Sequence, residues 1–432
     1  MTRIGIALAT ALVAACGHAA AQESVKCPEA ASGGVACYRG IDANGARYLI
    51  AIPPRWNEVL IVHAHDGPDV KPATDERVAD DFSRWTALVK AGYAWAGTSY
   101  RRPGFGVRSA AEDLESVRSL FISKFGAPRR ILVHGQGWGA GVAARAIELH
   151  PRSYDGALLT SGELAGGTRG EDPRIDLRVV YQYYCHNHPR PDEPQYPLWM
   201  GLPPGTRMTS ADVRVRLNEC TGSNLPVPQR TPAQRRALAS ILAATRIPER
   251  MLPEQLTWAT LVFADLVNRR LGGRNPFSTL DVRYTGTADD RALNAGVARY
   301  RPDPAALAEL AEDSDPTGRV EVPVLTLHGI GDPMAFVEHE SAYRETIERA
   351  GRSAFLAQVF TTESEHRFLS TPEYLAALDA LVAWVEGGKR PAPADVAARC
   401  RANLPSYGGE ACRIDPAYRA PPWNARVYPR AR

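Results

Sequence analysis

The sequence has almost no excess of charge of either sign. Its 432 residues include 51 lysines and arginines and 48 aspartates and glutamates, so the formal net charge is only +3. Proteins that hold nucleic acid or an anionic membrane surface through charge present a basic patch, whereas here the two signs are interspersed along the chain. We therefore expect no nucleic-acid partner, and we interpret arginine pairs such as Arg129-Arg130 as solvated surface.

The sequence also lacks an apolar run long enough to span a bilayer as a permanent helix. Residues 4–15, which follow Arg3, form an apolar stretch of about a dozen residues, and a spanning helix needs about 20. A basic residue, a short apolar stretch and then small residues are typical of an export signal. We expect residues 1–21 to be a signal peptide, which leaves a periplasmic or secreted protein with no integral membrane segment. A lipid anchor at Cys16 stays open, because the residues before it resemble a bacterial lipobox.

Cysteine is sparse, with seven in the chain, and removal of the signal would leave six. An even number of cysteines in an exported chain indicates disulfides. Six cysteines allow many connectivities, and the sequence does not choose among them. The simplest hypothesis joins neighbours along the chain: Cys27 to Cys37, Cys185 to Cys220 and Cys400 to Cys412.

Two short clusters could be mistaken for metal sites. His63 and His65 are followed at once by Asp66. In a hydrolytic metal signature the aspartate comes one residue later and a third histidine follows it, which is not the case here. Cys185 and His188 stand close together, and here a disulfide from Cys185 is the preferred interpretation because the chain is exported. We therefore assign no metal and no other cofactor.

Strand-like and helix-like segments alternate along most of the chain. Continuous apolar runs, for example at 59–63 and 131–133, are typical of strands buried in a parallel sheet. Amphipathic stretches lie between them, and Ser109 with Glu112 predicts a capping box at the start of one helix. The alternation predicts an α/β fold with a mostly parallel sheet flanked by helices on both faces.

This alternation breaks off near residue 162 and resumes near 322. The intervening residues are rich in proline and arginine and contain helical patches but no convincing strand. We therefore expect a sheet domain interrupted by a helical lid, followed by a Pro/Arg-rich tail with little periodicity. The expected boundaries are 22–165 for the first part of the sheet domain, 166–319 for the lid, 320–387 for the second part and 388–432 for the tail.

One strand–turn–helix segment, residues 130–141, has the pattern of a nucleophile elbow. Gly135 and Gly139 flank a position that a tight turn would lift above the sheet, and such a turn leaves no room for side chains on either side. In a serine hydrolase the lifted residue is the nucleophile. Here that position is Gly137, which has no reactive atom.

Two later strand ends carry the residue types that such a nucleophile needs. Asp332 follows the penultimate expected strand, and His366 follows the last one. The chain order of nucleophile position, acid and base is that of serine hydrolases with a parallel sheet. The sequence therefore resembles the α/β-hydrolase superfamily over residues 47–162 and 320–387, while the lid resembles no subfamily that would identify a substrate.

The resemblance implies roles for further residues. His366 would be the general base, and Asp332 would fix its tautomer. The oxyanion hole would use the backbone N–H of Trp138 and a second donor from Asp66 or Gly67. Glu163 is a reserve orienting acid, because Asp332 could be an ordinary turn aspartate before proline.

The resemblance implies hydrolysis of an ester bond, or less favourably an amide or peptide bond, in a small-molecule or short peptide substrate. Glycine at 137 implies an inactive or strongly impaired variant of that chemistry. Removal of the triad serine leaves a rate enhancement of only about 10³–10⁴-fold over the reaction in water. The alternative is a natural pseudoenzyme that binds a small apolar ligand in the retained pocket.

Overall fold

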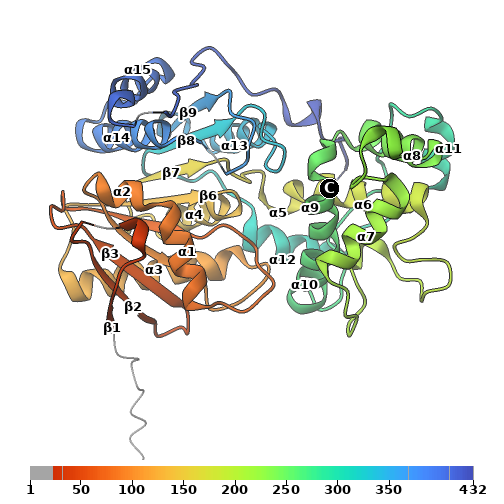
Figure 1. The fold of residues 1–432 in the computed structure, drawn as a ribbon, viewed down its shortest axis with the longest axis horizontal. Coiled ribbons are helices and arrows are strands. Elements are labelled where there is room, and N and C mark those ends of the chain that lie inside the picture. The colour runs from red at the N-terminus through yellow and green to blue at the C-terminus, as the bar shows by residue number, and fades with distance from the viewer. Residues whose placement is uncertain (1–22, 32, 368, 408, 432) are drawn as a thin grey trace, which may run out of the picture.

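A computed structural model describes residues 23–31, 33–367, 369–407 and 409–431. The expected signal peptide and Cys16 lie outside these residues. The chain forms a nine-stranded sheet covered by helices on both faces, with a separate group of helices beyond one side of the sheet (Figure 1). The expected fold class, a mostly parallel sheet flanked by helices, is confirmed.

The sheet has the order β1-β2-β3-β5-β4-β6-β7-β8-β9. The strands from β5 to β9 in this order run parallel, and β1, β2 and β3 add an antiparallel edge beside β5. Because β5 lies on one side of β4 and β6 on the other, the order reverses at β4, and the carboxyl ends of β4 and β6 border the crevice where α/β sheets bind ligands. The strand bounds are β1 Glu23–Val25, β2 Ala36–Ile41, β3 Arg47–Ile52, β4 Val59–Ala64, β5 Ala94–Thr98, β6 Arg130–Gln136, β7 Gly156–Thr160, β8 Val324–Gly329 and β9 Leu356–Thr361.

Each central strand is buried on both faces. In β4, Leu60 and Val62 pack into the apolar cluster under α3 and α4, whereas Val59 and Ile61 pack into the cluster under α1, α2 and α14. This two-sided burial explains why the strand is a continuous apolar run rather than an alternating one. The helices that cover the sheet are α1 Asp75–Arg84, α2 Thr86–Lys90, α3 Val107–Phe125, α4 Trp138–Leu149, α13 Glu338–Arg349, α14 Thr371–Gly387 and α15 Pro393–Asn403.

Helix α3 does not begin at the expected capping box. It begins at Val107, two residues before Ser109, and the Ser109 hydroxyl donates to the Gly106 carbonyl instead of capping the helix. The Asp313 carboxylate, which comes from α12, accepts from the backbone N–H groups of Val107 and Arg108 at 2.9 and 3.2 Å. A side chain distant in sequence therefore takes the role that the local pattern assigned to Ser109.

The segment between β7 and β8 is helical and packs continuously with the sheet domain. Its Phe263 and Ile241 belong to the same buried apolar cluster as Val62 of the sheet. Figure 1 shows helices α6, α7, α8 and α11 of this segment at the side of the molecule away from the sheet. The helix bounds are α5 Gly166–Gly170, α6 Asp172–Cys185, α7 Ser210–Thr221, α8 Pro232–Thr245, α9 Leu252–Thr257, α10 Phe263–Asp265, α11 Asp290–Gly296 and α12 Pro304–Ser314.

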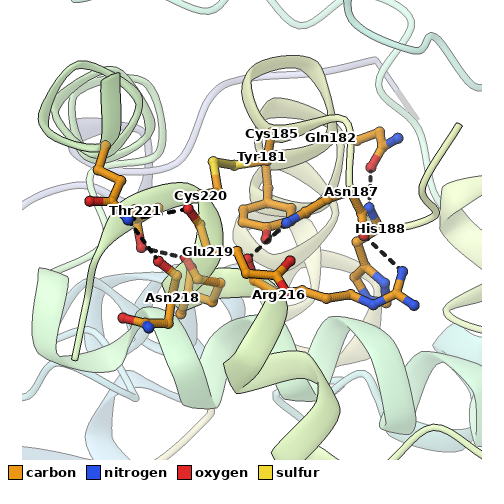
Figure 2. The surroundings of a disulfide bond; sticks show 12 residues. Tyr181, Gln182, Cys185, Asn187, His188, Arg216, Asn218, Glu219, Cys220 and Thr221 are labelled. Carbon is orange, nitrogen blue, oxygen red and sulfur yellow. Dashed lines mark hydrogen bonds between the residues drawn. A yellow bond between two sulfur atoms is a disulfide. The ribbon is translucent and has the colours of Figure 1, made fainter. Parts of the chain in front are cut away.

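Three disulfides join Cys27 to Cys37, Cys185 to Cys220 and Cys400 to Cys412. Cys185–Cys220 ties the end of α6 to α7 (Figure 2). Three disulfides in one chain indicate an oxidising compartment. Among the helices of the described ranges, none combines the length and the apolar character that crossing a membrane requires.

The residues after α15 cross back from the sheet domain to the helical segment, where the chain ends (Figure 1). Trp423 and Val427 are buried, and the Arg430 guanidinium reaches Asp176 at 2.6 Å and Asp172 at 3.4 Å. The final residues therefore form a strap between the two parts of the fold. The sequence predicted little periodicity over 388–432, yet this part begins with α15, and only the path after it is irregular apart from short 3-10 turns at Leu404–Ser406 and Trp423–Ala425.

Candidate active site

The turn after β6 is built so that glycine is required at its two flanks. A Cβ on Gly135 would lie 2.2 Å from the Gly139 carbonyl oxygen, and one on Gly139 would lie 2.4 Å from the Ala64 carbonyl oxygen. Between them Gly137 adopts φ 59° and ψ −126°, a strained conformation that lifts its Cα above the sheet. The backbone thus forms a nucleophile elbow without the nucleophilic side chain.

An imidazole and a carboxylate meet beside this turn. Asp332 follows β8 and His366 follows β9, and the Asp332 Oδ2 lies 2.8 Å from the His366 Nδ1. The other carboxylate oxygen, Oδ1, accepts from the backbone N–H groups of Met334 and Ala335 at 2.9 and 3.0 Å. With Asp332 held in this way, His366 presents Nε2 to the elbow, 2.9 Å from where a Cβ of residue 137 would lie.

The surroundings of His366 favour its protonated form. Burial lowers the pKa of the imidazole, but the carboxylates of Asp332, Asp66 and Glu163 outweigh burial and raise the pKa above 6.5. Asp332 contributes both its charge and its hydrogen bond. Such a histidine is a stronger base than a free imidazole, although it is unprotonated only at a higher pH.

Two backbone N–H groups converge on one point beside the elbow. Trp138 N, at the start of α4, and Gly67 N, in the loop after β4, lie 3.1 and 2.9 Å from the same atom, Asp66 Oδ1. Both belong to the oxyanion hole expected from the sequence. The backbone N–H of Asp66 was an expected donor. Instead, its side-chain oxygen Oδ1 lies between the two amides and accepts from both.

The Asp66 carboxylate also fills the space above Gly137. A Cβ on Gly137 would lie 2.5 Å from Asp66 Oδ1, closer than non-bonded atoms approach. The second oxygen, Oδ2, lies 2.8 Å from the guanidinium of Arg367, whose side chain is 53% exposed. Nothing in the local sequence signals Arg367 as a partner, although its position next to His366 places it at the same edge of the sheet.

Glu163 lies near the site but does not orient the imidazole. It pairs with Arg174 at 2.6 Å, and Arg174 also pairs with Glu171 and lies over the Trp258 ring at 3.9 Å from the ring centre. Burial raises the pKa of Glu171 to about 7, which Arg174 partly opposes. The acid bonded to the imidazole is therefore Asp332, and Glu163 acts on His366 through its charge.

A buried polar chain that the sequence does not reveal lies beneath the elbow. His63 and His134 face each other across β4 and β6 with their Nδ1 atoms 2.9 Å apart. Asp81, from α1, lies 3.2 Å from His63 Nε2 and 3.6 Å from His65. Burial and the neighbouring His63 lower the pKa of His134 well below its usual value. The positions of the two histidines at strand ends were visible in the sequence, whereas Asp81 in the middle of a helix gave no signal.

The site opens into a cavity of about 400 Å³ between the sheet domain and the helical segment. Asp66, Glu163 and His366 line its floor, and Trp258 and Val262 of the helical segment line its wall. Its remaining charged lining includes several arginines: Arg77, Arg84, Arg214 and Arg367. Asp69 and Glu254 also line the cavity and pair with Arg77 at 2.6 Å and Arg214 at 2.5 Å, so the cavity combines an apolar wall with ion pairs.

The strand order, the elbow after β6, and the acid and imidazole after β8 and β9 together form the arrangement of an α/β-hydrolase sheet. The chain has the α/β-hydrolase fold. The fold implied by the resemblance is thus confirmed.

Comparisons with known proteins give matches of low identity. No family model matches the α/β-hydrolase-fold chain. The o-phthalyl amidase of Xanthobacter agilis is 29% identical over 118 residues, which are 27% of this chain. The match spans only 24% of the length of that curated relative.

Among solved structures, feruloyl esterase B from Aspergillus oryzae is 15% identical with a TM-score of 0.43, over 83% of this chain and 82% of that one. Lipase A from Candida antarctica is 11% identical with a TM-score of 0.45, and the match covers 87% of this chain and 83% of the lipase chain. A puromycin hydrolase is 14% identical with a TM-score of 0.40, over 86% of this chain and 40% of its own.

Proposed function

We propose that the protein is an exported hydrolase that adds water to an ester bond of a small molecule, with His366 as the base. The observation that carries the proposal is the hydrogen bond that His366 Nδ1 donates to Asp332, which leaves Nε2 directed at the side-chain position of residue 137. A buried imidazole oriented by a carboxylate is the arrangement that takes a proton from an attacking group.

In this mechanism water takes the place of the serine hydroxyl. His366 accepts a proton from water, and Asp332 stabilises the resulting imidazolium. The Trp138 and Gly67 N–H groups, which donate to Asp66 Oδ1 in this structure, are the donors beside the reacting atoms. The helical segment over the cavity acts as a lid that excludes bulk water, and amide or peptide bonds are the less favoured substrates.

Export is part of the proposal. The apolar stretch near the N-terminus supports a signal peptide over residues 1–21, and the three disulfides support an oxidising destination. The protein would then meet its substrate in the periplasm or outside the cell.

The proposal is tested by the hydrolysis of a panel of carboxylic and sulfonic esters. We expect slow wild-type turnover that rises with pH, with its midpoint above pH 6.5, because His366 must be unprotonated and its pKa is raised. His366→Ala should lower the turnover by about 10²–10⁴-fold and remove this pH dependence. Glu365→Gln, which changes the exposed neighbour, is the matched control and should leave both unchanged.

A second function, binding without turnover, is favoured by Gly137 and by the carboxylate that occupies the oxyanion hole. A small apolar ligand would then bind in the cavity beside Trp258. Binding would be favoured over hydrolysis if the wild-type protein hydrolyses none of the esters but binds one of them in a calorimetric titration.

A further inference from the structure

We propose that the Asp66 carboxylate is the nucleophile of this site, presented by the loop after β4 in place of the side chain missing at position 137. The proposal rests on the proposed function, because His366 remains the base that activates water. The Asp66 Oδ1 lies 2.5 Å from the position of a Cβ on residue 137, so the carboxylate occupies the volume of the absent side chain. Carboxylates serve as covalent nucleophiles in other hydrolytic enzymes.

The two oxygens of Asp66 have different surroundings. Oδ1 accepts from the N–H groups of Gly67 and Trp138 and is held in the oxyanion hole. Oδ2 has only the guanidinium of Arg367 beside it, an ion pair without a directed hydrogen bond. Oδ2 is therefore the attacking atom, and Arg367 must turn outward to uncover it, which its exposed side chain allows.

The placement of the oxyanion hole determines the substrate class. Attack on an acyl carbon would create an oxyanion on the substrate, but the donors of the hole are already bonded to the nucleophile's own oxygen. Attack on a saturated carbon creates no oxyanion and needs no such donors. The substrate is therefore an alkyl ester of a strong acid, cleaved at its alkyl carbon.

The steps balance as a net hydrolysis. Oδ2 bonds to the alkyl carbon while the carbon–oxygen bond to the acid breaks, and the acid leaves as an anion with the electron pair. His366 then takes a proton from water, and the hydroxide attacks Asp66 Cγ, which places negative charge on Oδ1 between the Gly67 and Trp138 N–H groups. The tetrahedral adduct at Asp66 Cγ then collapses and expels the alkoxide, which carries Oδ2 away. The alkoxide takes a proton from His366, and the new Asp66 carboxyl group loses one proton to solvent.

The experiment uses hexyl methanesulfonate in water enriched in oxygen-18. After many turnovers, tandem mass spectrometry of wild-type protein should find heavy oxygen in Asp66, because each cycle replaces one of its oxygens from water. In His366→Ala the second step lacks its base, and Asp66 should accumulate the mass of one hexyl group. Asp66→Asn should lower turnover by at least about 10³-fold.

Asp80→Asn is the matched control, because it makes the same change on an exposed position of α1 and should leave turnover and labelling of Asp66 unchanged. Turnover that depends on His366 but leaves Asp66 unlabelled would overturn the inference and leave the proposed function standing. An increase in turnover on Asp66→Ala would identify the carboxylate as an obstruction and would also overturn it. If no ester of either class is hydrolysed, the proposed function itself fails.

Discussion

Position 137 and the side chain of Asp66 compete for one volume. The backbone at Gly137 keeps the strained conformation of a nucleophile elbow, with φ at 59°. A Cβ there would lie 2.5 Å from Asp66 Oδ1 and 2.9 Å from His366 Nε2, and both distances are shorter than a Cβ tolerates. Serine at 137 would therefore supply a nucleophile only after Asp66 leaves and His366 shifts slightly.

We therefore expect Gly137→Ser alone to react poorly with a fluorophosphonate probe. The double variant Gly137→Ser/Asp66→Ala should be labelled and should gain at least about 10²-fold on activated aryl esters, because serine, His366 and two free N–H donors would then be together. Labelling is read by intact mass and the gain by ester hydrolysis. His366→Ala in the double variant should abolish the gain, and a correctly folded but unlabelled double variant would refute this geometry.

The sequence predicted where the acid and the imidazole lie because both follow strands that end at the same edge of the sheet. Asp332 and His366 are close for that reason, and their catalytic roles remain proposals. The side chain of Asp66 could not be placed, because its direction depends on amides and on Arg367 from three separate loops. A rotamer chosen by such contacts leaves no pattern in the sequence.

At the scale of elements, the start of α3 depends on a contact from the helical segment. The first N–H groups of a helix have no partner within it, and here Asp313 accepts from two of them. Apolar strands such as β4 were predictable, whereas β1 and β2 were not, because β1 is a three-residue edge strand and β2, although six residues long, has exposed ends and no continuous apolar run.

Asp313→Ala should lower the free energy of unfolding by about 1 kcal/mol, within the range of about 0.5–2 kcal/mol measured for lost caps. Urea denaturation monitored by circular dichroism gives the value. The neighbouring Glu312→Ala removes an exposed carboxylate that pairs only with Arg108, and it should cost less than about 0.5 kcal/mol. Equal losses in the two variants would show that Asp313 does not cap α3.

At the scale of the whole molecule, the strap after α15 fastens the helical segment to the sheet domain. Its Arg430 is almost fully buried and pairs with Asp172 and Asp176 of α6. Burial raises the pKa of Asp176, but the charge of Arg430 opposes this shift. The pairing therefore places a cation beside two buried carboxylates.

Arg430→Met should be strongly destabilising, by about 3–5 kcal/mol, since it removes a buried cation from beside two buried carboxylates while preserving much of the side-chain volume. Arg419→Met lies on the same strap at an exposed position and should change the unfolding free energy by less than about 0.5 kcal/mol. Thermal and urea unfolding measure both. A small effect at Arg430 would mean that the strap carries little of the stability.

The insertion between β7 and β8 also bears on the order in which the molecule assembles. Ala157 of β7 pairs with Val324 of β8, although the entire helical segment separates them in sequence. We expect contacts this distant in sequence to form late in folding. Joining the two strands costs the conformational entropy of the long connection, and the strand pairing offsets this cost only once it has formed. The strands up to β7, with the elbow and Asp66, can associate early, while Asp332 and His366 arrive only with β8 and β9. We therefore expect the imidazole, which follows β9, to reach the site last, and we expect the edge of β7 to stay unpaired until β8 joins it.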